Sequence, residues 1–176
     1  MTHTAPAQRP TVAQLNAMDR AAFVDRLEGI FEHSPWIADR AWPARPFDSV
    51  DSLHAAMLRV LDQASDAEKL GLICAHPELA GKEAQEGTLT TASTGEQRGA
   101  GLDQCSRDEL LRLRSLNARY RERFGFPFVI AVKGFSRYQI MDAVEARLAH
   151  DRETEFAECL KQIGRIARFR LDALFG

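Results

Sequence analysis

A Ser-x-x-Glu pattern that occurs three times constrains this chain more than any other feature of its sequence. It is found at residues 65–68, 93–96 and 106–109. In such a capping box, the Ser side chain accepts a hydrogen bond from the third backbone N–H of a helix, and the Glu side chain accepts one from the N–H of the Ser. Each pattern therefore predicts that a helix begins there.

Apolar residues at helical spacing extend this interpretation to the rest of the chain. Phe23, Leu27 and Ile30 fall at i, i+4 and i+7, which predicts a helix over residues 20–32. Residues 80–91 are polar and carry two glycines, so we expect a loop there. Other helices are expected to begin near residues 11, 35, 49, 65, 93, 106, 136 and 151.

The sequence thus predicts an all-α protein. We expect a single compact domain of about seven to nine helices over residues 11–176, after a flexible tail at residues 1–10. A length of 176 residues suits one domain with a substantial core. The apolar run FVIAV at 128–132 resembles a strand, but no second strand is predicted to pair with it.

Composition argues against several classes of partner. The formal net charge of -2 gives no broad attraction to nucleic acid or to an anionic membrane. No apolar run approaches the roughly 20 residues of a membrane span, and the first ten residues lack the apolar core of a secretory signal. The three cysteines lie far apart without a CxxC pair, which fits a reducing cytoplasm.

The stretch from 76 to 102 concentrates polar residues between glycines. Pro77 disfavours the α conformation for the residue before it, so His76 should lie at the end of a helix, where its imidazole can face a pocket. Each residue also has a structural explanation. A histidine at a helix end is often structural, Ser93 and Glu96 can simply cap a helix, and Gln97 can lie at the surface.

Arg170 is predicted to point inward. At about 100° per residue, it lies roughly 20° around the last helix from Ile163, seven residues earlier. Because a guanidinium keeps its charge and is costly to bury unpaired, it needs a partner. That partner is either a ligand with a carboxylate or carbonyl oxygen, or a carboxylate of the protein itself.

Two further features leave alternatives open. The buried backbone groups of the 128–132 run need hydrogen-bond partners, which are a ligand or else neighbouring loops and water. His76, Glu78 and Glu96 together offer metal-ligand chemistry, but there is no HExxH motif, no second nearby histidine and no cysteine pair. We therefore predict no metal site, and the absence of glycine-rich phosphate loops argues against nucleotide binding.

With these residues established, the chain resembles the OHCU decarboxylases, which act on 2-oxo-4-hydroxy-4-carboxy-5-ureidoimidazoline in uric acid degradation. The resemblance runs from about Leu15 to Leu174. Several motifs in the same order make it specific. They are FEHSPW at 31–36, HPELAG at 76–81, LTTASTGEQRGAGL at 89–102, LNARYRERFGFPFVIAV at 116–132 and IARFRL at 166–171.

The resemblance implies a cofactor-free enzyme, usually a homodimer, that converts this small ureidoimidazoline to (S)-allantoin and carbon dioxide. It implies catalytic roles for His76, Glu96 and Arg170. It also implies substrate contacts for Pro77, Ser93, Gln97, Phe128, Val129, Ile130 and Ala131. The chain ends in LFG rather than a Ser-Lys-Leu type sequence, which favours a bacterial-type cytoplasmic enzyme.

One residue departs from the family pattern, and two other functions are alternatives. His150 stands where the family commonly has Asn, a difference that concerns a helix end more than the chemistry. The first alternative is a non-catalytic helical interaction module whose glycine-rich loop binds a partner. The second is a related ureide lyase or hydrolase that uses the same pocket.

Overall fold

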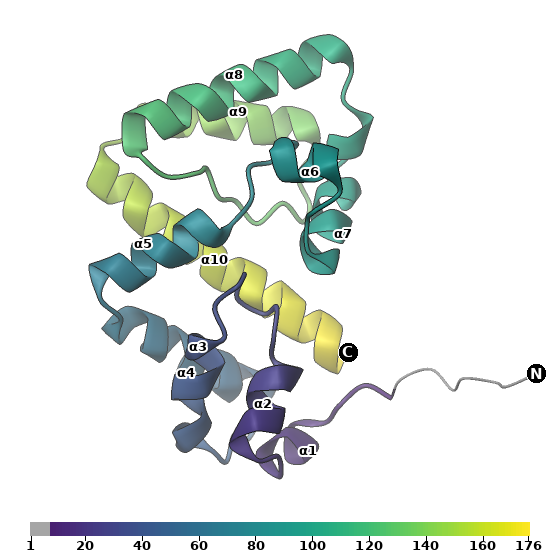
Figure 1. Ribbon diagram of the computed structural model, residues 1–176, viewed down its shortest axis with the longest axis vertical. Coiled ribbons are helices and arrows are strands. Elements are labelled where there is room, and N and C mark those ends of the chain that lie inside the picture. The colour runs from purple at the N-terminus through teal and green to yellow at the C-terminus, as the bar shows by residue number, and fades with distance from the viewer. Residues whose placement is uncertain (1–7) are drawn as a thin grey trace, which may run out of the picture. The chain divides into compact units, whose positions relative to one another are not determined.

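The computed structural model describes residues 8–176 (Figure 1), so residues 1–7 of the predicted tail lie outside the described part. Among the described residues there are ten α-helices, two short 3-10 helices and no strand. The predicted all-α class is therefore confirmed. One helix more than expected is present because α6 (Lys82–Glu86) forms inside the segment predicted to be a loop.

Contacts along the chain define two compact units. Of the described residues, the first unit contains 8–64 together with 167–176, and the second contains 65–166. The last helix, α10 (Arg152–Phe175), contributes residues to both units. The expectation of one domain over residues 11–176 stays a prediction.

Short helices build most of the first unit. Helix α2 packs against α3, and α3 packs against α4. The fully buried side chains at its centre include Leu15, Phe23, Ile37, Leu53 and Met57. The elements are α1 (Val12–Asn16), α2 (Arg20–Arg26), α3 (Trp36–Ala41), the 3-10 helix η1 (Trp42–Ala44) and α4 (Val50–Gln63).

The helix predicted over residues 20–32 is shorter than expected, because α2 ends at Arg26. Gly29 lies in the left-handed region with φ 84°, which a continuing right-handed helix does not allow. Leu27 and Ile30 are nevertheless buried, so the apolar spacing correctly identified core positions. Helix α3 begins near residue 35 as expected, with Pro35 as its N-cap, and the Ser34 hydroxyl donates to the Glu32 carbonyl.

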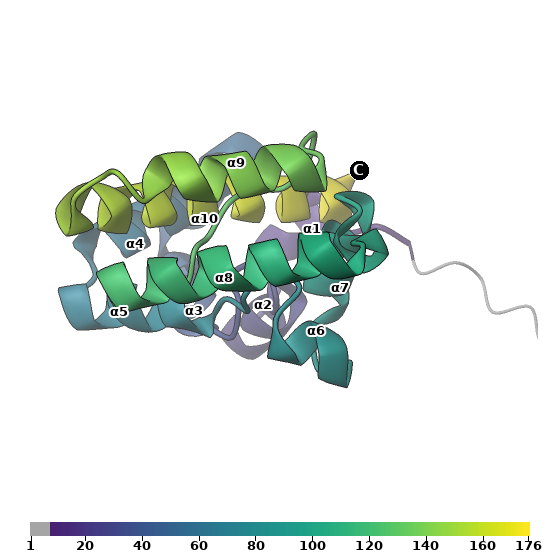
Figure 2. The same cartoon turned by 90° about the horizontal axis from the view of Figure 1, so that it is seen from above.

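Two of the three predicted capping boxes form in the second unit. Ser65 caps α5 (Asp66–Ala75), and Ser106 caps α8 (Arg107–Phe124), each with the reciprocal Glu bond to its backbone N–H. Helix α8 lies beside α9 (Arg137–Arg147) in both views (Figures 1 and 2). The unit also contains α7 (Thr91–Gly99) and the 3-10 helix η2 (Leu102–Gln104).

The capping box predicted at Ser93 is wrong. Helix α7 begins at Thr91, and Thr90 is its N-cap, with the Thr90 hydroxyl accepting from the Ser93 N–H at 3.2 Å. A Thr three residues earlier offers the same capping chemistry and starts the helix sooner. Glu96 therefore lies in the second turn, where capping does not explain a carboxylate.

Aromatic rings form the core of the second unit and enclose the end of α8. Tyr120 contacts the rings of Phe124, Phe126 and Phe128 at centroid distances of 4.6, 6.1 and 5.3 Å. Gly125 ends the helix in the left-handed conformation. Residues 126–132 then continue without regular secondary structure and are all buried, as the apolar run suggested.

Two glycines of the second unit should respond in opposite directions to alanine. Gly125→Ala places a Cβ at φ 80° and should lower the free energy of unfolding by roughly 1–2 kcal/mol. Gly71→Ala in α5, where a Cβ meets no atom within 4 Å, should raise it by up to about 1 kcal/mol. Denaturant unfolding measures both, and a loss of stability at Gly71 equal to that at Gly125 would contradict the conformational explanation.

Candidate active site

His76 lies where the sequence places it, directly after α5. It is the C-cap residue, with φ −77° and ψ 132°, the extended conformation that a following proline favours. Its side chain is buried, and its Nδ1 lies 2.8 Å from the Leu72 carbonyl oxygen. A carbonyl only accepts, so Nδ1 must carry a proton. Proton transfer by the neutral ring therefore falls to Nε2.

The turn that follows His76 is held by two buried side-chain amides. Gln97 accepts from the Ala80 N–H through Oε1 at 2.9 Å, and Asn117 donates through Nδ2 to the Leu79 carbonyl at 3.0 Å. Ala80 needs such support because it is a non-glycine residue with φ 49°. Gly81 cannot carry a side chain without movement, since a Cβ there would lie 2.8 Å from the Cβ of Glu78.

Helix α7 brings three of the predicted residues onto one face. Ser93, Glu96 and Gln97 are spaced i, i+3 and i+4. Ser93 and Gln97 are buried, while Glu96 is half-buried. Gln97 also accepts the hydrogen bond from the Ala80 N–H in the turn after His76. This face of α7 is therefore hydrogen-bonded to the turn that follows His76 and the half-exposed Pro77. The Nε2 of Gln97 is buried without a hydrogen-bond partner among the described residues.

The 128–131 segment obtains part of its hydrogen bonding from side chains of α9 and α10. The Val129 carbonyl accepts from Arg147 Nη1 at 2.8 Å, and the Ala131 N–H donates to Gln162 Oε1 at 3.1 Å. No hydrogen bond joins the backbone of Ile130 to any other described residue. Side chains of α9 and α10 therefore supply some of the partners, in addition to the ligand, loops or water that the sequence left open.

A buried carboxylate lies behind this segment. Glu155 is 0% exposed and accepts hydrogen bonds from Arg147 Nε at 2.9 Å, from His150 Nδ1 at 2.8 Å and from the Tyr120 hydroxyl. Burial alone favours the neutral acid, but hydrogen bonds from Arg147, Tyr120 and His150 outweigh it and lower the pKa of Glu155. Burial is also the main cause that raises the pKa of Tyr120, which keeps its hydroxyl a donor.

Sequence reasoning missed Glu155, although a signal for it existed. Glu155, Cys159, Gln162 and Ile166 are spaced i, i+4, i+7 and i+11, and all four are buried. The same helical arithmetic that found Arg170 would have placed this carboxylate and amide on an inward face of the last helix.

Arg170 is buried, as the helix arithmetic predicted, and is 8% exposed. In the first unit its Nη1 donates to Glu32 Oε2 at 2.7 Å and to the Gly29 carbonyl at 2.8 Å. The sequence left two kinds of partner for Arg170 open, a ligand and a carboxylate of the protein. The structure shows the carboxylate, Glu32. Glu32 itself was missed, because residues 20–32 were interpreted as one regular amphipathic helix.

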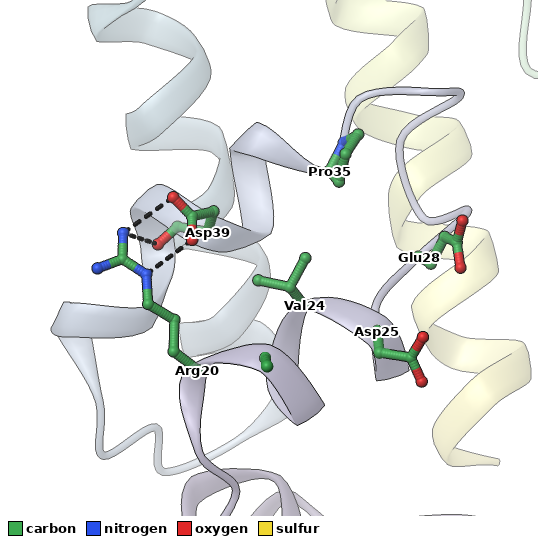
Figure 3. A pocket seen from close by; sticks show the side chains of 7 residues that line it. Arg20, Val24, Asp25, Glu28, Pro35 and Asp39 are labelled. Atoms are coloured by element: carbon green, nitrogen blue, oxygen red, sulfur yellow. Dashed lines mark hydrogen bonds and ion pairs between the residues drawn. The ribbon is translucent and has the colours of Figure 1, made fainter.

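Each unit has a surface pocket among its described residues. The pocket of the first unit has a volume of about 610 Å³, and Figure 3 shows the ion pair of Arg20 with Asp39 at its edge. It contains none of the predicted site residues. The pocket of the second unit, about 470 Å³, borders the turn after His76 and is lined by Glu78, Gly81, Lys82, Glu83, Arg114, Asn117, Ala118 and Arg121.

Within residues 8–176, no group of three His, Cys, Asp or Glu side chains is arranged to hold a metal ion. Glu78, one member of the metal set considered from sequence, is paired with Arg121 Nε at 2.8 Å. None of the described helices combines the length and apolar character required to span a bilayer.

Comparison with known proteins gives consistent matches. A sequence model of the family described as OHCU decarboxylase matches residues 16–172. The 2-oxo-4-hydroxy-4-carboxy-5-ureidoimidazoline decarboxylase of Haloferax volcanii is 44% identical over 94% of this chain and 96% of its own length. The uric acid degradation bifunctional protein PucL of Bacillus subtilis is 44% identical over 92% of this chain, which spans 32% of that protein.

A solved structure shares the fold. The crystal structure of an (S)-allantoin synthase superimposes with a TM-score of 0.75 at 30% sequence identity. The match covers 93% of this chain and 54% of that one.

The lowered pKa of Glu155 predicts a specific pH dependence of stability. A carboxylate whose pKa is lower in the folded state stabilises the fold above its unfolded value, about 4.3, and this contribution is lost as the pH falls through the folded-state pKa. Glu155→Gln should therefore lose about 3 kcal/mol at pH 7, because Arg147 stays buried without its counter-charge. The difference from the parent protein should shrink below about pH 4.

Chemical unfolding at a series of pH values measures this difference. Glu122→Gln is the matched control, since Glu122 is exposed. A stability gap that stays constant from pH 7 to pH 3 would show that Glu155 does not contribute through its charge.

Proposed function

Because the chain belongs to the OHCU decarboxylase family, it is a carboxy-lyase of uric acid degradation, and we propose that His76 and Glu96 perform the proton transfers of its reaction. The family model spans most of the chain, and the decarboxylase relative from Haloferax volcanii is matched over nearly its whole length. The reaction converts 2-oxo-4-hydroxy-4-carboxy-5-ureidoimidazoline to (S)-allantoin and carbon dioxide. A non-catalytic interaction module is not supported by these comparisons.

The substrate contains its own electron sink. Its carboxylate is attached to a ring carbon that also bears a hydroxyl and adjoins a ring C=N group. When the bond to the carboxyl carbon breaks, carbon dioxide leaves and the electron pair moves into this C=N group, whose nitrogen takes up a proton. The hydroxyl then loses its proton to become a carbonyl, while the neighbouring carbon gains one. The balance consumes one proton from solvent, and we propose that no cofactor is required.

His76 is proposed as the principal acid–base group, acting on the ring hydroxyl or on the carboxylate side. The observation that carries this proposal is the bond from Nδ1–H to the Leu72 carbonyl, which assigns proton exchange to Nε2. The His76 ring is buried. The backbone that carries it is fixed by Pro77 and by the hydrogen bond from the Ala80 N–H to Gln97. General acid–base catalysis by such a group contributes on the order of 10²–10⁴ in rate.

Glu96 is proposed to hold His76 or the ring hydroxyl and to share proton transfer. Its place in the second turn of α7, away from the N-cap, supports a role other than capping. Ser93 and Gln97 are proposed to bind the ureido arm, because they share the same helix face and are buried. Pro77 and the backbone of residues 128–131 complete the proposed substrate contacts.

Arg170 is proposed to bind an anionic or carbonyl oxygen of the substrate. Its planar guanidinium carries five N–H donors, and its Nη1 bonds Glu32 Oε2 and the Gly29 carbonyl. In this proposal Glu32 orients the guanidinium while the fork geometry selects a bidentate oxygen partner.

Assembly and location are proposed from the family resemblance. We expect a homodimer, which sedimentation of the purified protein at several concentrations tests directly. A cytoplasmic location is consistent with the three free cysteines. Fractionation of the native cells would check it.

His76→Ala and Glu96→Ala should fold normally and lose most formation of (S)-allantoin, by at least about 100-fold for His76. Freshly oxidised urate, supplied with the preceding hydrolase, provides the substrate, and circular dichroism follows the chiral product. His54→Ala and Glu122→Ala are the matched controls and should keep their activity. Full turnover by His76→Ala or Glu96→Ala would refute the role assigned to that residue, and a different product would favour a related ureide lyase or hydrolase.

Arg170→Lys should reduce kcat/KM by roughly 10–100-fold, because one ammonium cannot replace the guanidinium fork and a charge-assisted hydrogen bond is worth about 1.5–3 kcal/mol. Arg165→Lys, an exposed position of the same helix, is the control and should leave kcat/KM unchanged. Thermal unfolding of both variants separates a loss of folded protein from a loss of binding. An Arg170→Lys enzyme with normal kcat/KM would remove Arg170 from the site.

A further inference from the structure

We propose that Arg147 and Gln162 are positioning residues for the decarboxylation, because they fix the two peptide groups on either side of Ile130 and so orient its backbone N–H and C=O toward the substrate. This inference rests on the proposed role of residues 128–131 as substrate contacts. It adds residues of α9 and α10 that lie behind that segment and that neither the sequence motifs nor the family resemblance indicated.

Arg147 fixes the first peptide group. Its Nη1 donates to the Val129 carbonyl at 2.8 Å, while its Nε and Nη2 bond Glu155 at 2.9 and 2.8 Å. The guanidinium carbon also lies 4.3 Å from the ring centroid of Phe128. Because the guanidinium is planar and bonded along two sides, the Val129 carbonyl is held in one orientation.

Gln162 fixes the second peptide group. Its Oε1 accepts from the Ala131 N–H at 3.1 Å, and its Nε2 donates to Glu158 Oε1 at 2.7 Å. The bond to Glu158 determines which end of the amide faces the segment, because only the NH₂ group can donate to a carboxylate. Gln162 is 6% exposed, so water does not readily replace it.

The direction of the Ile130 groups follows from the planarity of the peptide bond. In a trans peptide group the C=O and the N–H point to opposite sides, and the peptide bonds next to Ile130 are trans. With the Val129 carbonyl bonded to Arg147, the Ile130 N–H must point away from Arg147. With the Ala131 N–H bonded to Gln162, the Ile130 C=O must point away from Gln162.

In this proposal the Ile130 N–H donor and the Ile130 C=O acceptor form one binding edge, and Ile130 is buried. The Val129 N–H is itself hydrogen-bonded to the Cys159 sulfur. A ligand that presents an N–H next to a C=O is complementary to the Ile130 edge, and both the ring and the ureido arm of the substrate contain such groups. The cationic bond to the Val129 carbonyl also polarises that peptide group, which makes the Ile130 N–H a stronger donor.

Gln162→Met removes the acceptor for the Ala131 N–H while keeping the length of the side chain. It should raise KM by about tenfold and change kcat by less than threefold, because the contact serves bound substrate in the ground state and the transition state alike. The exchanged pair Glu158→Gln with Gln162→Glu rebuilds both hydrogen bonds with the carboxylate and the amide interchanged. It should return KM to within about threefold of the parent value.

Arg147→Lys tests the peptide group between Val129 and Ile130 and should also raise KM. Gln104→Met, at an exposed site, is the control for Gln162→Met. A purely structural role would lower the thermal midpoint of Gln162→Met while its folded fraction kept the parent KM, and this result would overturn the proposal. Failure of the exchanged pair to restore KM would overturn it as well. Loss of activity in His76→Ala is independent of these outcomes, so the positioning role and the catalytic assignment are tested separately.

Discussion

The buried carboxylate of Glu155 is the group on which the organisation of the second unit depends. A charge with no exposure is stable only when donors surround it, and three elements supply them: α8 through Tyr120, α9 through Arg147, and the connection after α9 through His150. Each donor belongs to a separate part of the chain, so satisfying one carboxylate fixes α8, α9 and α10 together. Arg147 then extends this network to the Val129 carbonyl.

The turn after His76 is also held by buried polar contacts that join different parts of the chain. The turn after His76 contains a strained residue, Ala80, and a glycine that cannot be replaced without movement. Two buried amides from α7 and α8, Gln97 and Asn117, bond its backbone. In both sets, irregular backbone near the proposed site is held by side chains of regular helices, which are the more rigid elements.

The sequence predicted elements best where one local signal had no competitor. Ser65 and Ser106 cap helices as expected, whereas Thr90 precedes Ser93 and takes its role. The periodicity of residues 23–30 correctly identified buried positions but not the end of α2, because apolar spacing does not reveal a left-handed residue such as Gly29.

Prediction of the candidate site was limited in the same way, because local patterns do not specify contacts between distant residues. Helical periodicity placed Arg170 inward, since direction around a helix depends only on residue number. It could not identify Glu32 as the partner, because that pairing joins residues 138 positions apart. Glu155 and Gln162 were accessible to the same arithmetic, but their bonds to α9 and to residues 128–131 depend on tertiary packing. Pairings of this kind are not encoded in any local pattern.

The hydrogen bond between His76 and the Leu72 carbonyl has a stereochemical consequence. An imidazole tethered at Nδ1 cannot rotate by half a turn about its Cβ–Cγ bond without breaking that tether. In the proposed site, Nε2 therefore keeps one fixed direction from which it exchanges a proton with the substrate. A single main-chain oxygen in the last turn of α5 would then help to set which face of the planar intermediate receives the proton.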